Sequence, residues 1–520
     1  MPTCLLGIDI GTGGIKVAVI NNHGEVLSHV YKELPLICEK PGWAEHNSSQ
    51  YWPTVCDLIK SSLAETNLAP GDIKGIASSS ALPSFVIVDH KHRPLQNTFI
   101  LLDRRASQEV DEIRTQIGEE LIFNLTANRL DDHPILVNLL WTKKNRPSIL
   151  DGAYKVLTPD GYITLRLTGM ATGHHSAGPF FGVAYDLRQG QFDEKILTSI
   201  GIPHELLPDI FPCEAIVGEV TRQAADDCGL QPGTPVIAGQ VDCNASWIGA
   251  GAIEEGDIQS NLGSVGNFGI VHQNWDFIFS DVGRLMINFP YTINSRKTLI
   301  TVPTTLTGGQ CVRFIRDNIL NFGEIEGLNK RVPSYDDLNL LAEEIPLGCN
   351  GLIVLPYLMG ERTPIWNNQA RGLIFGLSLN HSLGHLVRAM MEGVAFAMYD
   401  SFRLIQSAGL KINFPIVMNE GGVISKLWRS IITDVFNVPT VLVKRRTGAP
   451  YGDAILAGVA TGVIPDFNVT KQWVELIDPI EPNSENHHRY LDIFSLYKQV
   501  YEHVKDDYNS LTKLREKYSD

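Results

Sequence analysis

Apolar and polar residues alternate in blocks from the first positions of the chain, and the opening block predicts a β-hairpin. Residues 4–10 are mainly apolar, residues 11–14 read Gly-Thr-Gly-Gly, and residues 15–20 are again mainly apolar. Two apolar runs joined by a short glycine-rich segment are typical of paired antiparallel strands. Apolar side chains then recur at helical spacing over residues 52–63, so the chain begins with mixed β and α structure.

The same order returns in the middle of the chain. Residues 258–271 read as an apolar strand, a glycine turn with a hydroxyl residue, and a second strand. Such a repeat indicates two similar α/β domains that face one another, each presenting a polar turn to a shared cleft. Residues 247–253 are apolar and mostly small, as expected where a packed helix leads into a linker. We therefore expect one domain over residues 1–253 and a second over residues 254–520.

The end of the chain predicts an amphipathic helix over residues 490–518. Apolar side chains recur there at helical spacing, at Ile493, Tyr497, Val500 and Val504. The polar face carries both signs of charge, which favours packing on the body of the protein over binding at a membrane surface.

The composition is that of an ordinary globular protein, with 44% hydrophobic and 19% charged residues in 520. The 43 Lys and Arg against 58 Asp and Glu give a net charge of −15, and the basic residues are scattered, so nucleic acid is not an expected partner. Eight cysteines without a Cys-x-x-Cys pair are read as reduced, mostly buried thiols. No apolar run approaches the roughly 20 residues that span a bilayer, and we expect a cytosolic protein without a membrane partner.

The first glycine turn is a candidate phosphate site. Glycines let backbone N–H groups converge on an anion, and Thr12 and Lys16 add a hydroxyl donor and a positive charge. A tight hairpin that needs left-handed backbone angles would give the same sequence. Two such turns, one in each half of the chain, favour phosphate binding.

Two carboxylates stand at the ends of apolar strands. Asp9 precedes the first turn, where it would hold Mg²⁺ beside a nucleotide phosphate or cap the turn. Asp242 follows the apolar residues 235–241 and precedes the start of a helix. An N-cap is the commoner local interpretation of Asp242, whereas a base fits the end of a strand, where α/β ligand clefts form.

Two further segments carry candidate chemistry. A glycine turn at 419–422 follows the strand 414–418 and would let a flat ring lie against backbone, as for adenosine. Residues 100–105 predict the end of a strand on which Asp103 and Arg105 share one side. That pair would either hydrogen-bond a polyhydroxylated substrate or form a solvated ion pair.

Taken together and in this order, these segments resemble the FGGY family of carbohydrate kinases, within the actin-like, ribonuclease H-like ATPase fold. The similarity runs nearly end to end and is closest overall to the xylulose kinases of that family. The motifs that carry it are Gly-Ile-Asp-Ile-Gly-Thr at 7–12, Pro-Gly-Trp-Ala-Glu-His at 41–46, Asp-x-Arg at 103–105, Ala-Gly-Gln-Val-Asp at 238–242, Gly-Glu-Arg-Thr-Pro at 360–364, and the signature region over 372–377 and 388–393.

The resemblance implies a role for individual residues in ATP-dependent, Mg²⁺-dependent phosphorylation of a sugar hydroxyl. Asp242 is implied to be the general base, Asp9 to support Mg²⁺, and Asp103 to contact the sugar. The implied ATP contacts are Thr12, Gly13 and Lys16 in a first phosphate loop, Gly263 and Ser264 in a second, Gly309 as a phosphate-contacting glycine, and Gly421, Gly422 and Lys426 in an adenosine motif. A homodimer is compatible with the resemblance, although the sequence carries no interface signal.

Departures from the family concern the substrate. Xylulose kinases carry Gln-x-His after a serine-rich strand, where this chain has Ala81 and Pro83. Leu101 replaces a tryptophan, Asn138 stands at the expected position of a lysine, and the second loop reads Gly-Ser-Val.

The sequence therefore does not identify the sugar substrate. A ketopentose such as xylulose is the first expectation, and ribulose, erythritol, glycerol or gluconate are alternatives. A hypothesis of a different class is an actin-like ATP-dependent switch, and a further one is a degenerate kinase that serves as a sensor. The Asp103, Arg105 and Asp242 set argues against a pure switch, which would not require it.

Overall fold

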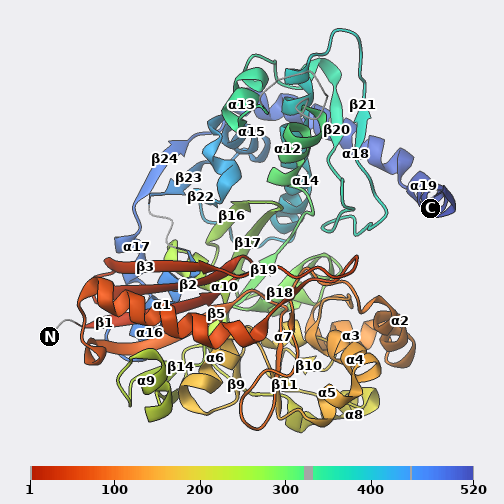
Figure 1. The fold of residues 1–520 in the computed structure, drawn as a ribbon. Helices are drawn as coiled ribbons and strands as arrows, with labels where there is room; N and C mark the ends of the chain where they lie inside the picture. The colour runs from red at the N-terminus through yellow and green to blue at the C-terminus, as the bar shows by residue number, and fades with distance from the viewer. Residues whose placement is uncertain (1–2, 321–331, 445–447, 519–520) are drawn as a thin grey trace, which may run out of the picture.

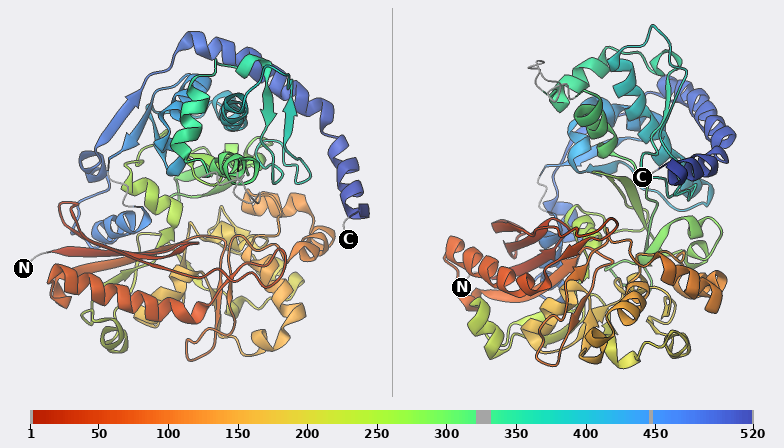
Figure 2. Two further views of the ribbon diagram at one scale, coloured as in Figure 1. Left: turned by 45° about the horizontal axis from the view of Figure 1, so that its top comes forward. Right: turned by 45° about the vertical axis from the view of Figure 1, so that its right-hand side comes forward.

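The computed structural model describes residues 3–320, 332–444 and 448–518 and has two α/β lobes stacked one on the other (Figures 1 and 2). Each lobe contains a mixed sheet of seven strands within these residues. Across the first sheet the strands are β13 (Ile216–Glu219), β14 (Pro235–Ile237), β5 (Ile73–Ser80), β1 (Cys4–Ile10), β2 (Gly14–Asn21) and β3 (Val26–Glu33), with β15 (Gln240–Val241) also paired to β5. Across the second they are β18 (Ile287–Pro290), β19 (Leu299–Val302), β17 (Gly266–His272), β16 (Ile258–Leu262), β22 (Ile416–Asn419), β23 (Thr440–Val443) and β24 (Leu476–Ile480).

The two sheets share one strand arrangement. β1 and β2 form the predicted antiparallel hairpin, and β16 and β17 form the second. In each sheet the first hairpin strand has a parallel neighbour on its other side, β5 beside β1 and β22 beside β16. This correspondence confirms the predicted α/β fold with two similar halves. The domain boundary at Ile253 stays a prediction.

Helices cover both sheets and fill an insertion beside the first one (Figure 1). In the first lobe they are α1 (Tyr51–Thr66), α2 (Ser107–Gln116), α3 (Glu119–Thr126), α4 (Ile135–Asn145), α5 (Pro147–Asp151), α6 (Pro159–Thr168), α7 (Gly178–Phe181), α8 (Glu194–Ile200), α9 (Arg222–Cys228) and α10 (Asp242–Gly249). In the second half of the chain they are α11 (Trp275–Ile278), α12 (Gly309–Phe314), α13 (Tyr335–Glu343), α14 (Leu383–Ser407), α15 (Lys426–Phe436), α16 (Ala449–Ala460), α17 (Val469–Trp473), α18 (Ser484–Val504) and α19 (Asp507–Tyr518).

Short strand pairs connect these elements. They are β4 (Glu45–His46) with β7 (Thr98–Phe99), β6 (Val86–Val88) with β8 (Lys155–Leu157), β9 (Thr172–His174) with β12 (Asp209–Phe211), β10 (Tyr185–Asp186) with β11 (Gln191–Phe192), and β20 (Ile353–Leu355) with β21 (Leu373–Phe375).

Helix α16 ties the second half of the chain to the first lobe. It lies in the second half by sequence but packs against β1, β5 and α10. The approach is close enough to require glycines, because a Cβ on Gly7 would stand 1.9 Å from the Pro450 carbonyl oxygen, and one on Gly452 would stand 1.8 Å from that of Ala245. Backbone therefore packs directly on backbone where α16 meets β1 and α10.

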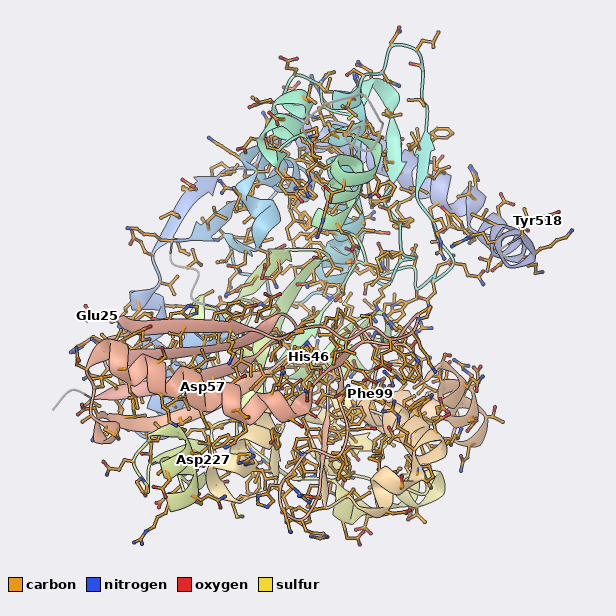
Figure 3. The ribbon with its side chains drawn as sticks, in the orientation of Figure 1. Glu25, His46, Asp57, Phe99, Asp227 and Tyr518 are labelled. Carbon is orange, nitrogen blue, oxygen red and sulfur yellow. The ribbon has the colours of Figure 1, made fainter. Side chains whose placement is uncertain are left out.

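The end of the chain corrects one prediction. Residues 490–518 belong to two helices, α18 and α19, rather than to one. The buried stripe of α18 follows the predicted spacing through Tyr497 and Val500. Residues 505–507 read Lys-Asp-Asp and offer no apolar side chain to continue it. Helix α19 then runs away from the body to Tyr518, which is 71% exposed (Figure 3).

All eight cysteines are free thiols and six of them are buried, in agreement with the prediction of mostly buried thiols; the other two are Cys38 and Cys243. Within the described residues, each helix is too short or too polar to cross a membrane.

The contact between α16 and α10 predicts a large effect of Gly452→Ala. The added Cβ collides with backbone rather than with a movable side chain, so we expect a loss of unfolding free energy of about 1–3 kcal/mol or more. Chemical denaturation measures this loss. The matched control is Gly152→Ala, where φ is −93° and the nearest atom to a Cβ is 3.7 Å away, and where we expect a change within about 0.5 kcal/mol. Equal stability of the two variants would contradict the close packing of α16.

Candidate active site

A buried carboxylate paired with lysine lies at the end of the first hairpin. Asp9 and Lys16 are cross-strand partners, and Lys16 Nζ lies 3.1 Å from Asp9 Oδ2. The Asp9 side chain is 3% exposed and the Lys16 side chain 38% exposed, so the pair has one buried and one accessible end. Burial raises the pKa of Asp9, and Lys16 opposes this effect. The adjoining turn leaves Thr12 partly exposed and Gly13 exposed, as an anion-binding turn requires.

Asp242 stands directly after β15 as the first residue of α10. The N-cap is Val241, so the interpretation of Asp242 as an N-cap is wrong. Its Oδ1 accepts a hydrogen bond of 2.7 Å from the backbone N–H of Cys243. Burial, together with the nearby charge of Asp9, raises the pKa of Asp242 to about 7. A carboxyl group with this pKa can accept a proton near neutral pH, as a general base must.

A further carboxyl group is linked to Asp9 through Ser79, and the sequence analysis missed it. Asp453, on α16, is fully buried. Ser79 Oγ lies 2.7 Å from Asp453 Oδ2 and 3.4 Å from Asp9 Oδ1, and Gln240 Nε2 donates to Asp453 Oδ1 at 2.9 Å. Ser79 and Asp453 are 374 positions apart in sequence, and Asp453 lies in an otherwise apolar helix. No local pattern in the sequence marks this contact.

The glycine turns of the second lobe converge on one cavity of about 780 Å³. Five of the predicted ATP contacts line it, namely Gly263, Ser264, Gly309, Gly421 and Gly422. A neighbouring cavity of about 290 Å³ is lined by Lys16 and Asn261, and both cavities share Glu420 and Gly421. The predicted phosphate and adenosine segments therefore line two cavities that share part of their wall. Lys426 is exposed at the start of α15 and is not among the lining residues.

Glu361 supports the loop that leads to Gly309, and this role was also missed. Its carboxyl group accepts hydrogen bonds from the backbone N–H of Leu306 at 2.6 Å and from the Thr307 hydroxyl at 3.3 Å. Glu361 is 1% exposed, and burial raises its pKa to about 7. Gly309 N–H in turn donates to the Gly263 carbonyl at 2.7 Å, which joins the two predicted phosphate segments.

Asp103 and Arg105 form a buried pair, so the predicted solvated ion pair is wrong. They lie in a turn after β7 rather than on a strand, and both side chains are 1% exposed. The Arg105 guanidinium lies 3.8 Å from the ring centroids of Trp43 and Phe99, beside the β4–β7 pair where Figure 3 labels His46 and Phe99.

The four acceptor positions of the Asp103 carboxylate are filled within the protein. Oδ1 accepts from the Arg105 backbone N–H and Nε, and Oδ2 accepts from Arg105 Nη2 and the Ala44 backbone N–H. A sugar contact by Asp103 stays a prediction and would require one of these partners to be exchanged.

The structure shows where the residues that depart from the family pattern lie. Ala81 follows β5 and donates its N–H to the Ile10 carbonyl at 3.0 Å, which puts Ala81 and the partly buried Pro83 beside the end of β1. Asn138 Nδ2 donates to the backbone carbonyls of residues 132–134, so it holds the loop that precedes α4. Direct contact of Ala81 or Pro83 with a sugar stays a prediction.

The loop that Asn138 holds carries a cluster of metal-ligand type, Asp131, Asp132 and His133. Two arginines already engage it: Arg104 Nη1 lies 2.7 Å from Asp132 Oδ1, and Arg362 Nη2 lies 3.4 Å from Asp131 Oδ2. Arg362 follows Glu361 in the second half of the chain, so the cluster serves as an ion-pair contact between the two halves.

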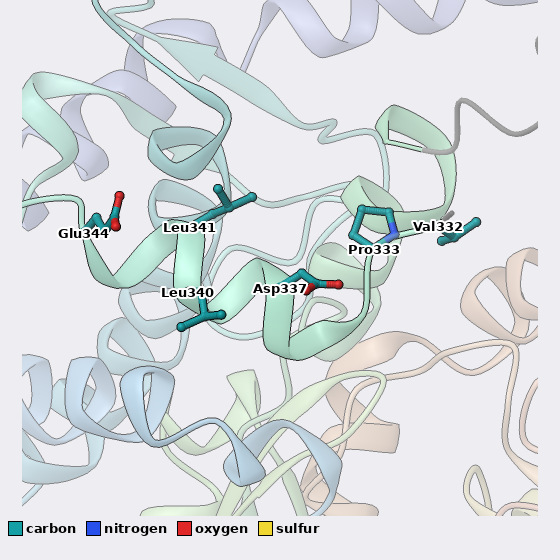
Figure 4. Close-up of a pocket in the computed structure, with 6 residues that line it drawn as sticks. All are labelled: Val332, Pro333, Asp337, Leu340, Leu341 and Glu344. Carbon is teal, nitrogen blue, oxygen red and sulfur yellow. The ribbon is translucent and has the colours of Figure 1, made fainter. Parts of the chain in front are cut away.

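A separate pocket of about 490 Å³ lies on α13 (Figure 4). Val332, Leu340 and Leu341 are among the residues that line it, and it shares none of its lining residues with the 780 Å³ cavity. It is not part of the candidate site.

Comparison with known proteins gives two family matches. Residues 4–249 match the N-terminal domain, and residues 300–461 the C-terminal domain, of the FGGY family of carbohydrate kinases. Xylulose kinase of Bacillus subtilis (strain 168) is 27% identical over 512 residues, which cover 98% of this chain and 99% of that protein. Gluconokinase of the same organism is 27% identical over 502 residues, 95% of each chain.

Solved structures with the same fold cover nearly the whole chain. The xylulose kinase from Rhodospirillum rubrum has a TM-score of 0.88 at 24% identity and covers 97% of this chain and 100% of that one. The glycerol kinase from Plasmodium falciparum, solved with ADP, has a TM-score of 0.84 at 19% identity and covers 96% and 98%. These similarities confirm the predicted actin-like fold.

The contacts of Glu361 predict weaker nucleotide binding in Glu361→Ala. The loop at 304–309 would lose its side-chain acceptors, and we expect the dissociation constant for ADP to rise by roughly tenfold, or about 1.4 kcal/mol. Isothermal titration calorimetry measures it, with the exposed Glu343→Ala as the matched control. Unchanged ADP affinity in the Glu361 variant would contradict a supporting role for this residue.

Proposed function

The chain belongs to the FGGY family of carbohydrate kinases, and from this premise we propose that it transfers the γ-phosphate of ATP to a primary hydroxyl group of a ketopentose such as xylulose. Members of this family are phosphotransferases with an alcohol group as acceptor. The observation that supports the site best is that Asp242, with a pKa of about 7, lies close enough to Asp9 and Lys16 for their charges to affect it.

In the proposed reaction Asp242 acts as the general base. The carboxylate of Asp242 takes the proton from the sugar hydroxyl while the hydroxyl oxygen forms a bond to the γ-phosphorus. The bond between that phosphorus and the β–γ bridging oxygen breaks, and ADP leaves. Phosphoryl transfer of this kind depends on positioning and charge neutralisation more than on covalent catalysis. A cleft between two lobes also excludes water, which competes as an acceptor.

Asp9 suits a supporting role toward Mg²⁺. Its Oδ2 faces Lys16, while its Oδ1 has a 3.4 Å contact with Ser79, which leaves acceptor capacity for a cation or its bound water. Mg²⁺ held there would neutralise charge on the ATP phosphates. Lys16, Gly263, Ser264 and Gly309 would bind the phosphates from the two halves of the chain.

The choice of a ketopentose rests on the xylulose kinases among the relatives. A sugar acid is the second candidate, because a gluconokinase matches at the same 27% identity. Ala81 and Pro83 are compatible with this alternative, because they stand where xylulose kinases carry the polar side chains of Gln-x-His.

The base assignment predicts the effect of Asp242→Asn. The amide cannot accept the proton, so we expect sugar-dependent ADP release to fall by about 100- to 10,000-fold while the ATP affinity stays within about threefold. A coupled ADP assay and a nucleotide titration measure the two quantities, and the exposed Asp57→Asn on α1 is the control. An Asp242 variant with near-normal turnover would refute the assignment.

The raised pKa of Asp242 predicts the pH dependence of kcat/KM for the sugar. Asp242 is active as the ionised base, so kcat/KM should fall by about tenfold per pH unit below pH 7 and level off above it. A pH profile in saturating Mg²⁺–ATP and limiting sugar records this limb. Constant kcat/KM down to pH 5 would show that no group with this pKa serves as the base.

A further inference from the structure

Asp453 forms the centre of a buried hydrogen-bond chain that leads to Asp9. Ser79 connects Asp453 to Asp9 on one side, with distances of 2.7 Å and 3.4 Å, respectively. Gln240 connects it on the other side and accepts in turn from the Thr292 hydroxyl at 2.6 Å. Gln240 is two residues before Asp242 on β15, and its strand neighbour on β5 is Ser79 itself. This hydrogen-bond chain therefore reaches Asp9 through Ser79 and involves the strand that immediately precedes Asp242.

The hydrogen atoms in this chain can be counted. The Ser79 hydroxyl has one hydrogen and lies near two carboxyl groups. If Asp453 is ionised, Ser79 donates to it and nothing is donated to Asp9 Oδ1. If Asp453 carries a proton on Oδ2, it donates to Ser79, and Ser79 is free to donate to Asp9. The second arrangement satisfies both contacts.

The surroundings of Asp453 favour the protonated form. It is fully buried, and among residues 3–320, 332–444 and 448–518 no lysine, arginine or histidine lies within ion-pair distance of it. Burial raises its pKa well above the ordinary value, and the charges of Asp9 and Asp160 act in the same direction. An isolated carboxylate in such a place would pay a large desolvation cost.

We propose that Asp453 is a positioning residue that acts as a neutral carboxylic acid, donating to Ser79 so that Ser79 donates to Asp9, and accepting from Gln240 through its other oxygen. This inference rests on the proposed function, in which Asp9 supports Mg²⁺–ATP. The effect is to fix Oδ1 of Asp9 from behind while Lys16 holds Oδ2. Groups that hydrogen-bond to a metal-binding carboxylate fix its orientation, and their loss lowers metal affinity or activity by about 10- to 100-fold.

The neutral acid can be distinguished from a carboxylate by an amide. In Asp453→Asn, the amide oxygen can accept from Gln240 and the amide nitrogen can donate to Ser79, as the proposed acid does. An ionised Asp453 would accept from both neighbours, and asparagine could not replace it. Asp453→Ala removes both contacts, and Ser79→Ala removes the bridge while leaving Asp453 in place.

The test is the Mg²⁺ dependence of binding of the non-hydrolysable ATP analogue AMPPNP to the full chain, by calorimetry. We expect the Mg²⁺ concentration that gives half of the affinity gain to rise by about 10- to 100-fold in Asp453→Ala and Ser79→Ala. Asp453→Asn should stay within about threefold of the unaltered protein. The double variant of Ser79→Ala and Asp453→Ala should match Ser79→Ala alone, since both act through one contact.

A control separates this effect from the loss of any buried hydroxyl. Ser62→Ala removes a fully buried serine on α1 whose partner is Ser28 on β3, and it should leave the Mg²⁺ dependence unchanged. The inference is overturned if Asp453→Asn is as impaired as Asp453→Ala, if Ser79→Ala behaves as the unaltered protein, or if the two alanine effects add. If Asp453→Ala does not fold, Asp453→Asn and Ser79→Ala still decide the question.

The binding readout also separates this inference from the proposed function. The proposed function would be overturned if the unaltered protein phosphorylates no sugar. The role of Asp453 would still be supported if the unaltered protein binds AMPPNP in a Mg²⁺-dependent way and the variants change this dependence as expected. If the affinity of the unaltered protein for AMPPNP does not change with Mg²⁺ concentration, the role of Asp9 is overturned, and with it that of Asp453.

Discussion

Four buried or half-buried carboxyl groups at the junction of the first sheet with α6, α10 and α16 set the conditions that the rest of the site must meet. They are Asp9, Asp160, Asp242 and Asp453. Each of these groups, when ionised, raises the cost of ionising its neighbours, and the phosphates of a nucleotide would add more negative charge. The protein compensates each group differently. Lys16 faces Asp9, His174 Nε2 lies 2.9 Å from Asp160, and Ser79 with Gln240 binds Asp453. Asp242 accepts a backbone hydrogen bond from Cys243, and burial together with the charge of Asp9 raises its pKa to about 7.

The close packing of α16 brings Asp453 into this group of carboxyl groups. The helix reaches back from the second half of the chain to put Asp453 behind Asp9, and glycines at 7 and 452 let its backbone meet β1 and α10 without side chains between them. The nucleotide-sized cavity, in contrast, is formed by turns of the second lobe and meets the first lobe at the space lined by Lys16. Glu361 and Arg362, adjacent in sequence, support that cavity and the ion-pair contact between the halves, respectively. The proposed binding and catalytic residues thus come from segments of both halves.

The sequence predicts the features that depend on local pattern. Both hairpins, the turn at 419–422 and the helix start at Asp242 follow from apolar runs and glycines, and the structure contains them. It could not predict Asp453, because a single acid in the apolar segment 449–460 acquires its partners through tertiary contacts alone. The burial of Asp103 and Arg105 was missed for a related reason: the aromatic rings that cover Arg105 come from residues 43 and 99, and charge alone suggests exposure. The assignment of catalytic roles to Asp9 and Asp242 came from resemblance, since local reasoning left both undecided.

The most direct test of this account is ADP release from Mg²⁺–ATP across a panel of D- and L-pentuloses, tetritols, glycerol, hexuloses and sugar acids, with a control that lacks sugar. The account predicts slow release in the control and strong stimulation by a ketopentose. Stimulation by a sugar acid alone would contradict the proposed substrate. Brisk release that no compound changes would contradict sugar phosphorylation by this site and favour an ATP-driven switch.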